Sequence, residues 1–260
     1  MPELPEVYTI VQGLKTLVGR KITKVWAEKP KVLRMAKRTE DRKILDIARR
    51  GKNIVLNFDK NLSLLIHSKM TGRFLLNQRD KYERIIFNFT KGDFLTFSDK
   101  RRFANVVLGS RQKVEATINS IGRDALEIKF TEFKNAIISK KSRIKCVLMD
   151  QNVVAGIGNI YADEILWKAK INPLKSANSL SAIEFKNIFG AMNSILKKSI
   201  KLRGVSIQDY RDIFGKLGEY QNHRLVYGRE GEKCKRCNEK IQRIKIAQRS
   251  AHFCPRCQHI

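Results

Sequence analysis

Four cysteines near the end of the chain constrain its fold more than any other feature. They form two Cys-x2-Cys pairs sixteen residues apart: Cys234 with Cys237, and Cys254 with Cys257. Such pairs can supply four thiolates in a tetrahedron, the closed geometry of a structural zinc site. Two disulfides are the alternative, but no basic stretch followed by an apolar one opens the chain, so we expect a reducing compartment. The sequence therefore predicts one structural Zn2+ ion in a small module over residues 225–260.

The charge of the chain points to a polyanionic partner. Its 53 Lys and Arg residues outnumber its 25 Asp and Glu residues, and the net charge of +28 is shared equally by residues 1–130 and 131–260. Nucleic acid can neutralise such an excess with the release of counterions. An anionic membrane surface and a high-salt or A/T-rich genome are the alternatives. The sequence has no run of 18 apolar residues and no basic amphipathic helix, so we expect a cytoplasmic protein without a membrane partner.

The first half of the sequence predicts one helix followed by short strands. Residues 5–18 place apolar side chains on one helical face, with Pro5 in the first turn and Gly19 at the stop. From about residue 20 to 110, short β-type runs alternate with turns, which indicates a sandwich or a barrel. The predicted buried face of the helix consists of Val7, Ile10, Val11, Leu14, Leu17 and Val18.

After about residue 125 the pattern becomes helical. The longest predicted helix follows Ser181 and Glu184, which are spaced as a capping box, and ends at Gly204. Residues 204–222 are rich in glycine and polar residues, so we expect a loop. Cys146 lies in an apolar run, where we expect a buried thiol. The predicted core face of the long helix consists of Phe185, Ile188, Phe189, Met192, Ile195 and Leu196.

Three motifs resemble one known family in the right order. "MPELPEV" at the start, "GIGNIYADE" in the middle and "VYGREGEKCKRC" with "AQRSAHFCPRCQ" at the end are similar to formamidopyrimidine-DNA glycosylases, bacterial enzymes that remove oxidised purines. The resemblance implies an α+β multidomain fold: an N-terminal helix and β-sandwich over residues 1–120, a helix-two-turn-helix domain over 125–222 and a β-hairpin zinc finger over 225–260. It also implies binding to damaged double-stranded DNA and no small-molecule cofactor. The sequence shows no heptad pattern or symmetric interface, so we expect a monomer.

The start of the chain has a chemical interpretation. Removal of Met1 would leave Pro2 with a free secondary amine, and an α-amino group titrates near pKa ~8, so part of it is neutral and nucleophilic at pH 7. By resemblance, Pro2 is the nucleophile, Glu3 the acid and base, Glu6 a supporting residue and Lys52 a catalytic lysine. The alternatives are complementarity to the helix dipole for the two glutamates and a solvated strand residue for Lys52.

Four further residues match DNA-contacting positions of the family. Asn159, at a predicted helix N-terminus, and Arg249, between the cysteine pairs, match a phosphate clamp. His67 also falls at a phosphate-contact position, although a structural histidine fits nearly as well. Arg84 stands where the family commonly has a phosphate-contacting histidine.

The resemblance also implies a wedge for base flipping. An enzyme that acts on a base within a duplex must extrude it and fill the gap. Met70, Arg101 and Phe103 match the void-filling residues, with Arg101 hydrogen-bonded to the widowed cytosine and Phe103 inserted into the stack. The chain departs from the family pattern around this set at Ser68, Lys69, Lys100 and Ala104.

Two rival hypotheses remain open at this stage. The related endonuclease-eight-like branch prefers oxidised pyrimidines and shares Pro2 and Glu3, but it typically has glycine where this chain has Leu4. A non-catalytic zinc-ribbon protein would bind DNA without chemistry. Excision of a damaged base separates the second rival from the glycosylases, and the identity of the excised base separates the two branches.

Overall fold

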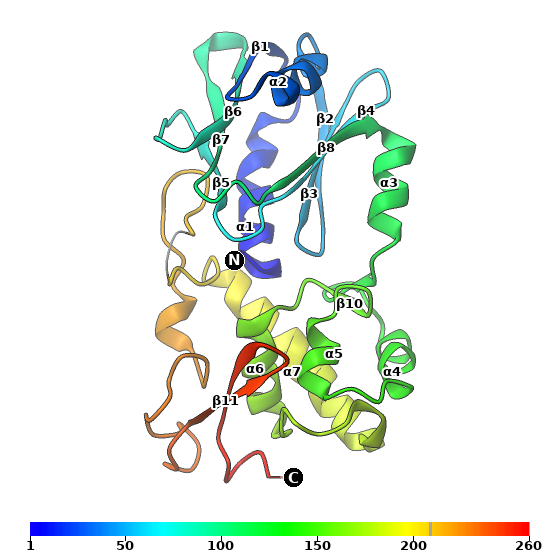
Figure 1. Cartoon of the computed structure of the whole chain (residues 1–260), viewed down its shortest axis with the longest axis vertical. Coiled ribbons are helices and arrows are strands. Elements are labelled where there is room, and N and C mark those ends of the chain that lie inside the picture. Colours follow the sequence, from blue (N-terminus) through cyan, green and yellow to red (C-terminus); the bar gives the residue numbers. More distant parts are fainter. Residues whose placement is uncertain (208–209, 260) are drawn as a thin grey trace. The chain divides into compact units, whose positions relative to one another are not determined.

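The computed structural model describes residues 1–207 and 210–259, and the chain divides into two compact units (Figure 1). The first unit comprises residues 1–120 and 202–221, and the second comprises residues 121–201 and 222–260. Among the described residues, no helix is both long and apolar enough to cross a membrane. Residues 208 and 209 of the predicted loop lie outside the described residues.

The first unit is built from one N-terminal helix and two antiparallel sheets. Helix α1 (Leu4–Leu14) continues into a 3-10 turn at Lys15–Leu17. The first sheet has the order β1 (Ile22–Ala27), β6 (Glu83–Phe89), β7 (Phe94–Asp99) and β5 (Gly72–Leu76). The second sheet has the order β2 (Ile44–Arg50), β3 (Asn53–Phe58), β4 (Leu62–His67) and β8 (Asn105–Ser110). These elements confirm the predicted N-terminal helix and β-sandwich.

One hydrophobic core joins α1 to both sheets. The apolar face of α1 and inward-facing residues of each sheet belong to a single buried cluster. The prediction was wrong for Val18, which is 42% exposed because it follows the last helical turn. It also missed two short helices, α2 (Pro30–Ala36) and α3 (Arg111–Asn119). The side chain of Ser110 caps α3, so this serine was the available sequence signal.

The second unit is mainly helical. Its helices are α4 (Phe130–Ile138), α5 (Ile144–Met149), α6 (Asn159–Ala169) and α7 (Ala182–Lys201). A short parallel pair joins β9 (Arg123–Asp124) and β10 (Val154–Ala155), and a C-terminal hairpin joins β11 (Gln242–Ile246) and β12 (Arg249–Phe253). Further 3-10 turns of the chain lie at Lys37–Thr39, Thr90–Gly92, Ala177–Ser179 and Tyr220–His223.

The capping box predicted for the long helix is confirmed. Glu184 N–H donates to Ser181 Oγ at 3.3 Å, and Ser181 N–H donates to Glu184 Oε2 at 2.8 Å. The predicted core face of α7 is buried except at Phe189, which is half-buried and packs its ring against Phe130 and Phe133.

The structure also corrects the interpretation of α5. Cys146 is half-buried rather than buried, whereas the neighbouring Lys145 is only 1% exposed. The prediction followed side-chain hydrophobicity, which favours a thiol over an ammonium group in a core. Lys145 is buried because distant parts of the same unit supply its partners.

Candidate active site

The residues that follow the exposed Met1 are buried in the first unit. Pro2 lies in the extended segment before α1, and the following glutamates, Glu3 and Glu6, are 3% and 2% exposed. Glu6 Oε2 accepts the backbone N–H of Glu3 at 2.8 Å. Pro5 occupies the first turn of the helix, where its missing N–H costs nothing. The first turn of α1 therefore fixes the backbone that carries Pro2 and Glu3.

Glu6 also binds the segment that returns to the first unit after α7. Its Oε1 accepts the N–H of Val205 at 2.8 Å. Gly204 has φ +81°, and a Cβ added there would lie 2.4 Å from Glu6 Oε1, so this close approach requires glycine. Burial, together with the nearby charge of Glu6, raises the pKa of Tyr210, whose hydroxyl donates to the Glu6 carbonyl at 3.4 Å. One carboxylate thus holds both the start of α1 and residues 204–205.

Lys52 and His67 lie close together at the ends of neighbouring strands. Lys52 is 5% exposed in the turn between β2 and β3, and the next residue, Asn53, pairs with His67 of β4. Burial, together with the charges of Lys69 and Lys52, lowers the pKa of His67 to about 4. His67 Nδ1 accepts the N–H of Lys69 at 3.0 Å. At pH 7 the ring is therefore neutral, with its proton on Nε2 available for donation.

The three predicted wedge residues are exposed and in mutual contact. Met70 is 43% exposed and Phe103 is 56% exposed. The guanidinium of Arg101 lies 4.7 Å from the centroid of the Phe103 ring, and its Nη1 lies 3.1 Å from Met70 Sδ. Lys69 and Arg102, beside the wedge in the chain, have φ of +49° and +57°, a conformation that glycine adopts more easily. Lys69 therefore stands at a position whose backbone would suit glycine better.

Asp99 holds both wedge segments and was missed by the sequence analysis. It is 1% exposed at the end of β7, and its Oδ1 accepts the hydroxyl of Thr71, next to Met70. Its Oδ2 accepts the N–H of Ala104, next to Phe103, at 2.8 Å. Ala104, a departure from the family pattern, therefore still makes this backbone bond. The only sequence signal was an aspartate at the end of an apolar strand.

Arg84 is largely occupied by acidic partners. Its side chain is 15% exposed, its Nε lies 3.2 Å from Glu28 Oε2 and its Nη1 lies 3.9 Å from Asp99 Oδ2. Lys100, another departure from the family pattern, places its Nζ 5.7 Å from the centroid of the Tyr82 ring. The proposed phosphate contact of Arg84 stays a prediction, and these ion pairs already balance its charge.

The predicted phosphate contacts of the second unit lie at element ends. Asn159 is the first residue of α6, and its Oδ1 has no hydrogen-bond partner among residues 1–207 and 210–259. Gly156 has φ +112°, a conformation that glycine adopts easily, so the chain can turn sharply before it enters α6. Arg249 is exposed and begins β12 directly after a turn in which Ala247 and Gln248 both have positive φ.

The four cysteines meet the requirements of a zinc site. Their Sγ atoms all lie within 4.8 Å of one another, close to the ~3.8 Å edges of a tetrahedron with Zn–S distances of about 2.3 Å. Backbone N–H groups of Arg236 and Cys257 point at the sulfurs of Cys234 and Cys254, both at 3.4 Å. Four thiolates leave no open position, so the ion supplies structure rather than catalysis.

Three family models match this chain along nearly its whole length. They are the formamidopyrimidine-DNA glycosylase N-terminal domain at residues 1–106, the formamidopyrimidine-DNA glycosylase H2TH domain at 121–211, and the zinc finger found in FPG and IleRS at 231–260.

Curated relatives and solved structures agree with the family models. Formamidopyrimidine-DNA glycosylases of Herpetosiphon aurantiacus and Pelotomaculum thermopropionicum are 40% and 38% identical, with 99% and 100% of this chain and 100% of each relative covered. A complex of Lactococcus lactis Fpg with DNA containing an abasic site has a TM-score of 0.92 at 35% identity, covering 99% of this chain and 100% of that one. A mutant of the same protein with a Fapy-dG containing DNA has a TM-score of 0.93 at 35% identity, with both chains fully covered.

Proposed function

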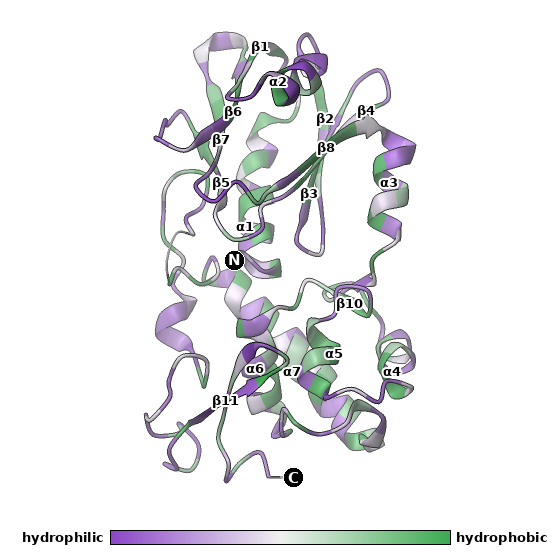
Figure 2. Cartoon of the chain, in the orientation of Figure 1, coloured by the Kyte–Doolittle hydropathy of each residue, from purple (hydrophilic) through white to green (hydrophobic). Residues whose placement is uncertain are grey.

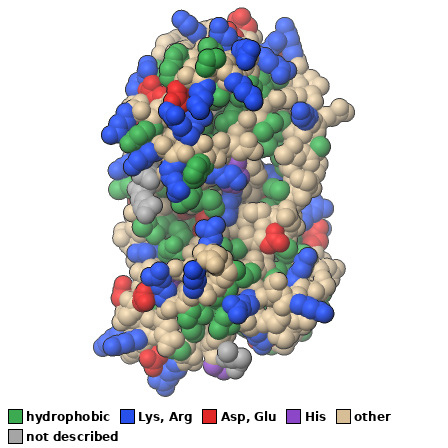
Figure 3. Space-filling model, viewed as in Figure 1, with side chains coloured by type: hydrophobic (Ala, Val, Ile, Leu, Met, Phe, Trp, Pro, Cys, Tyr) green, Lys and Arg blue, Asp and Glu red, His purple; other side chains and the backbone are tan. Residues whose placement is uncertain are grey.

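Because the chain belongs to the formamidopyrimidine-DNA glycosylase family, we propose that it excises oxidised purines from duplex DNA with Pro2 as the nucleophile. The observation that carries this proposal is the anchoring of Glu3 by the buried Glu6 carboxylate, directly beside Pro2. An amine that attacks a sugar needs a fixed direction of approach, and this hydrogen bond restrains the adjoining backbone. In Figure 3, Lys and Arg side chains are spread over the whole face drawn, whereas acidic side chains are sparse, as expected for a protein that binds DNA.

The chemistry follows from the secondary amine of Pro2 once Met1 is removed. The nitrogen attacks C1′ of the damaged nucleotide, and the base leaves with the electron pair of the broken bond and a proton. Ring opening, with a proton delivered to O4′, gives an iminium ion between C1′ and the Pro2 nitrogen. This cation acidifies the C2′ proton, and loss of that proton expels the 3′ phosphate. A second elimination expels the 5′ phosphate.

The other residues have roles that suit their positions. Glu3 is the acid that protonates the leaving base or O4′, because it is the carboxyl group next to the nucleophile. Glu6 holds Glu3, and Lys52 contributes a charge near the lesion. His67, neutral with its proton on Nε2, and Asn159 and Arg249 donate hydrogen bonds to phosphates.

The wedge residues stabilise the extruded state of the base. Met70, Arg101 and Phe103 are exposed and in contact, so the cluster can enter the stack without leaving a cavity in the protein core. We also propose that the enzyme acts as a monomer in the bacterial cytoplasm, with residues 125–222 as its helix-two-turn-helix domain. The related Lactococcus lactis protein forms complexes with DNA that contains an abasic site or Fapy-dG.

Borohydride trapping on DNA with an abasic site tests the nucleophile, because only a Schiff-base former becomes cross-linked to DNA. Pro2→Gly keeps an α-amine at the chain terminus but loses the ring that fixes its direction, so trapping should fall about tenfold. Pro5→Gly is the matched control, since it changes the same residue type within the first helical turn, and it should trap like the wild type. Trapping of Pro2→Gly at the wild-type rate would refute the assignment. Mass spectrometry verifies that Met1 is absent from each preparation.

A second experiment tests the substrate class. The wild type should release 8-oxoguanine paired with cytosine faster than it releases thymine glycol. Faster release of the pyrimidine lesion would favour the endonuclease-eight-like activity.

A further inference from the structure

A buried ion pair in the second unit has no part in the chemistry described above. Lys145 of α5 and Asp163 of α6 lie 2.6 Å apart between Nζ and Oδ1, with side chains 1% and 0% exposed. Figure 2 shows α5 as hydrophobic along most of its length, so a lysine there is exceptional. Apolar residues of similar size usually stabilise a core as well as a buried ion pair does, or better. The pair therefore calls for an explanation other than stability.

Both charged groups bind the backbone of β12. Lys145 Nζ donates to the carbonyl oxygen of Ser250. Asp163 Oδ2 accepts the N–H of His252 at 2.9 Å and lies 3.1 Å from His252 Nδ1. Ser250 and His252 are alternate residues of the strand, so their contacts with the ion pair lie along the same edge of β12.

The register of the hairpin explains why these backbone groups are available. Arg249 faces Ile246 across the two-residue turn, so Ser250 and His252 fall at the pairs that do not exchange hydrogen bonds with β11. Their N–H and C=O groups consequently point away from β11, towards the open edge of a two-stranded sheet. Lys145 and Asp163 form the hydrogen bonds at that edge that a third strand would otherwise form.

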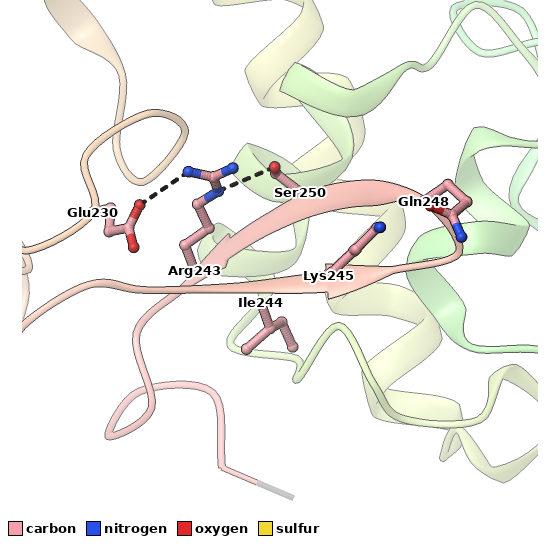
Figure 4. A pocket seen from close by; sticks show the side chains of 6 residues that line it. All are labelled: Glu230, Arg243, Ile244, Lys245, Gln248 and Ser250. Atoms are coloured by element: carbon pink, nitrogen blue, oxygen red, sulfur yellow. Dashed lines mark hydrogen bonds and ion pairs between the residues drawn. The ribbon is translucent and has the colours of Figure 1, made fainter.

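The turn by itself supports the position of Arg249 only weakly, so the bonds at the open edge of β12 contribute more to it. Ala247 and Gln248 have φ of +44° and +64°, which non-glycine residues adopt at a cost, and an isolated hairpin is marginally stable. Arg249 is the residue directly before Ser250, so the bond from Lys145 fixes the strand one residue from it. On the sheet face drawn in Figure 4, Arg243 bonds Ser250 Oγ at 3.1 Å and Glu230 at 3.4 Å, both within the zinc module itself.

We propose that Lys145 and Asp163 are positioning residues that hold Arg249 for contact with a DNA phosphate. They act through the backbone of Ser250 and His252 and do not touch the DNA. This inference rests on the proposed function, because it takes Arg249 as a phosphate ligand. It predicts that loss of the ion pair weakens DNA binding only as far as Arg249 contributes to binding.

The test replaces the pair without leaving an unpaired buried charge. Lys145→Met with Asp163→Leu keeps the net charge and the approximate volume but leaves the edge of β12 unbound. Arg123→Met with Glu132→Leu is the matched control, because it removes a more exposed ion pair of the same unit. Lys145→Arg is the conservative variant, since its guanidinium keeps the charge and can still pair with Asp163 and donate to the carbonyl oxygen of Ser250. Each protein is assayed for zinc content and for its Kd towards a duplex containing a tetrahydrofuran abasic-site analogue, with and without Arg249→Ala.

We expect the effects of replacing the ion pair and of Arg249→Ala on Kd to be non-additive. The Lys145→Met, Asp163→Leu protein should retain one zinc per chain and bind the duplex about tenfold more weakly, and Arg249→Ala should then cost little more. Lys145→Arg should lose less affinity, and the control pair should bind like the wild type. Unchanged affinity, loss of zinc, or fold-changes that simply multiply with that of Arg249→Ala would each overturn the proposal.

Failure of the inference can be separated from failure of the proposed function. Borohydride trapping of the wild type on abasic DNA is measured in parallel. If the wild type is trapped but the fold-changes in Kd of the pair replacement and of Arg249→Ala simply multiply, only the positioning role is refuted. Failed trapping with a non-additive cycle would refute the chemistry and leave the positioning of Arg249 supported.

Discussion

The start of α1 and the zinc hairpin show two different ways to fix a functional segment. At the start of α1, one carboxylate, Glu6, accepts N–H groups from Glu3 and from Val205, which lies 199 positions away from it. In the hairpin, four cysteines from a single 24-residue stretch converge on one site, and the Lys145–Asp163 pair binds the strand edge.

This difference matches what each segment has to do. Under the proposed function, the chain terminus has to be held while its own nitrogen stays free to react, and a side chain holds the neighbouring backbone through charge-assisted hydrogen bonds. The hairpin only has to present Arg249, so a closed metal site that blocks chemistry is suitable there. The start of α1 depends on a long-range contact, whereas the hairpin combines a local metal site with a long-range contact to Lys145 and Asp163.

The largest expected effect comes from removing the metal. Cys254→Ser should abolish zinc binding, because a structural zinc contributes about 10–16 kcal/mol to the folding of such modules. DNA affinity should fall at least about a hundredfold, while the unfolding of the first unit stays unchanged. Zinc analysis and fluorescence anisotropy measure these effects, with Cys146→Ser as the control thiol outside the cluster. Wild-type DNA affinity in a zinc-free variant would show that the hairpin does not need its metal.

Glu6→Gln tests how the start of α1 is held in place. Glutamine has one acceptor oxygen, so its NH2 group must face either the N–H of Glu3 or that of Val205. Leaving one buried donor unsatisfied costs about 1–3 kcal/mol, so kcat for base excision should fall roughly 10- to 100-fold. DNA affinity should hardly change. Single-turnover kinetics and anisotropy separate the two quantities.

An exposed glutamate of the same unit provides the control for Glu6. Glu115→Gln on α3 carries the same change in charge and should behave like the wild type. If Glu6→Gln lowered DNA affinity as much as kcat, the carboxylate would support the fold of the unit in general rather than the chain terminus.

The sequence predicted the elements whose causes are local. The zinc ligands follow from spacing, the Ser181–Glu184 box from a three-residue offset and the strands from alternating apolar runs. Pro2 and Glu3 could be proposed from their position and from the family resemblance. Each of these inferences needs only a short window of sequence.

The sequence could not reveal contacts that join distant segments. The anchoring of Val205 by Glu6 and of Ser250 by Lys145 spans 199 and 105 positions, respectively. At α5, side-chain hydrophobicity favoured Cys146 as the buried residue, whereas the structure buries Lys145 beside Asp163. A charged residue within an apolar helix was a signal of such a contact, but it did not identify the partner.

His67, which lies in the first unit, should make the free energy of unfolding of that unit depend on pH. Its pKa falls from 6.5 to about 4 on folding, so the unfolded chain binds the proton first as the pH drops. Stability should therefore decline between pH 6.5 and 4 by roughly 2–3 kcal/mol, and His67→Gln should lack this decline. Urea unfolding, followed by the fluorescence of Trp26 in a Trp167→Phe background, reports on the first unit. An equal decline in His67→Gln would assign the pH dependence to other groups.

The smallest effect is expected at the wedge, which neither a metal nor a buried glutamate holds directly. Phe103 is 56% exposed, so Phe103→Ala should leave stability unchanged but remove a stacking surface worth about 1–3 kcal/mol. Excision from duplex DNA should slow about tenfold, whereas trapping on single-stranded abasic DNA, which needs no base flipping, should not change. Trp26→Ala, which removes another exposed aromatic side chain of the first unit, is the control. Equal slowing on both substrates would mean that Phe103 serves the chemistry at Pro2 and not the opening of the duplex.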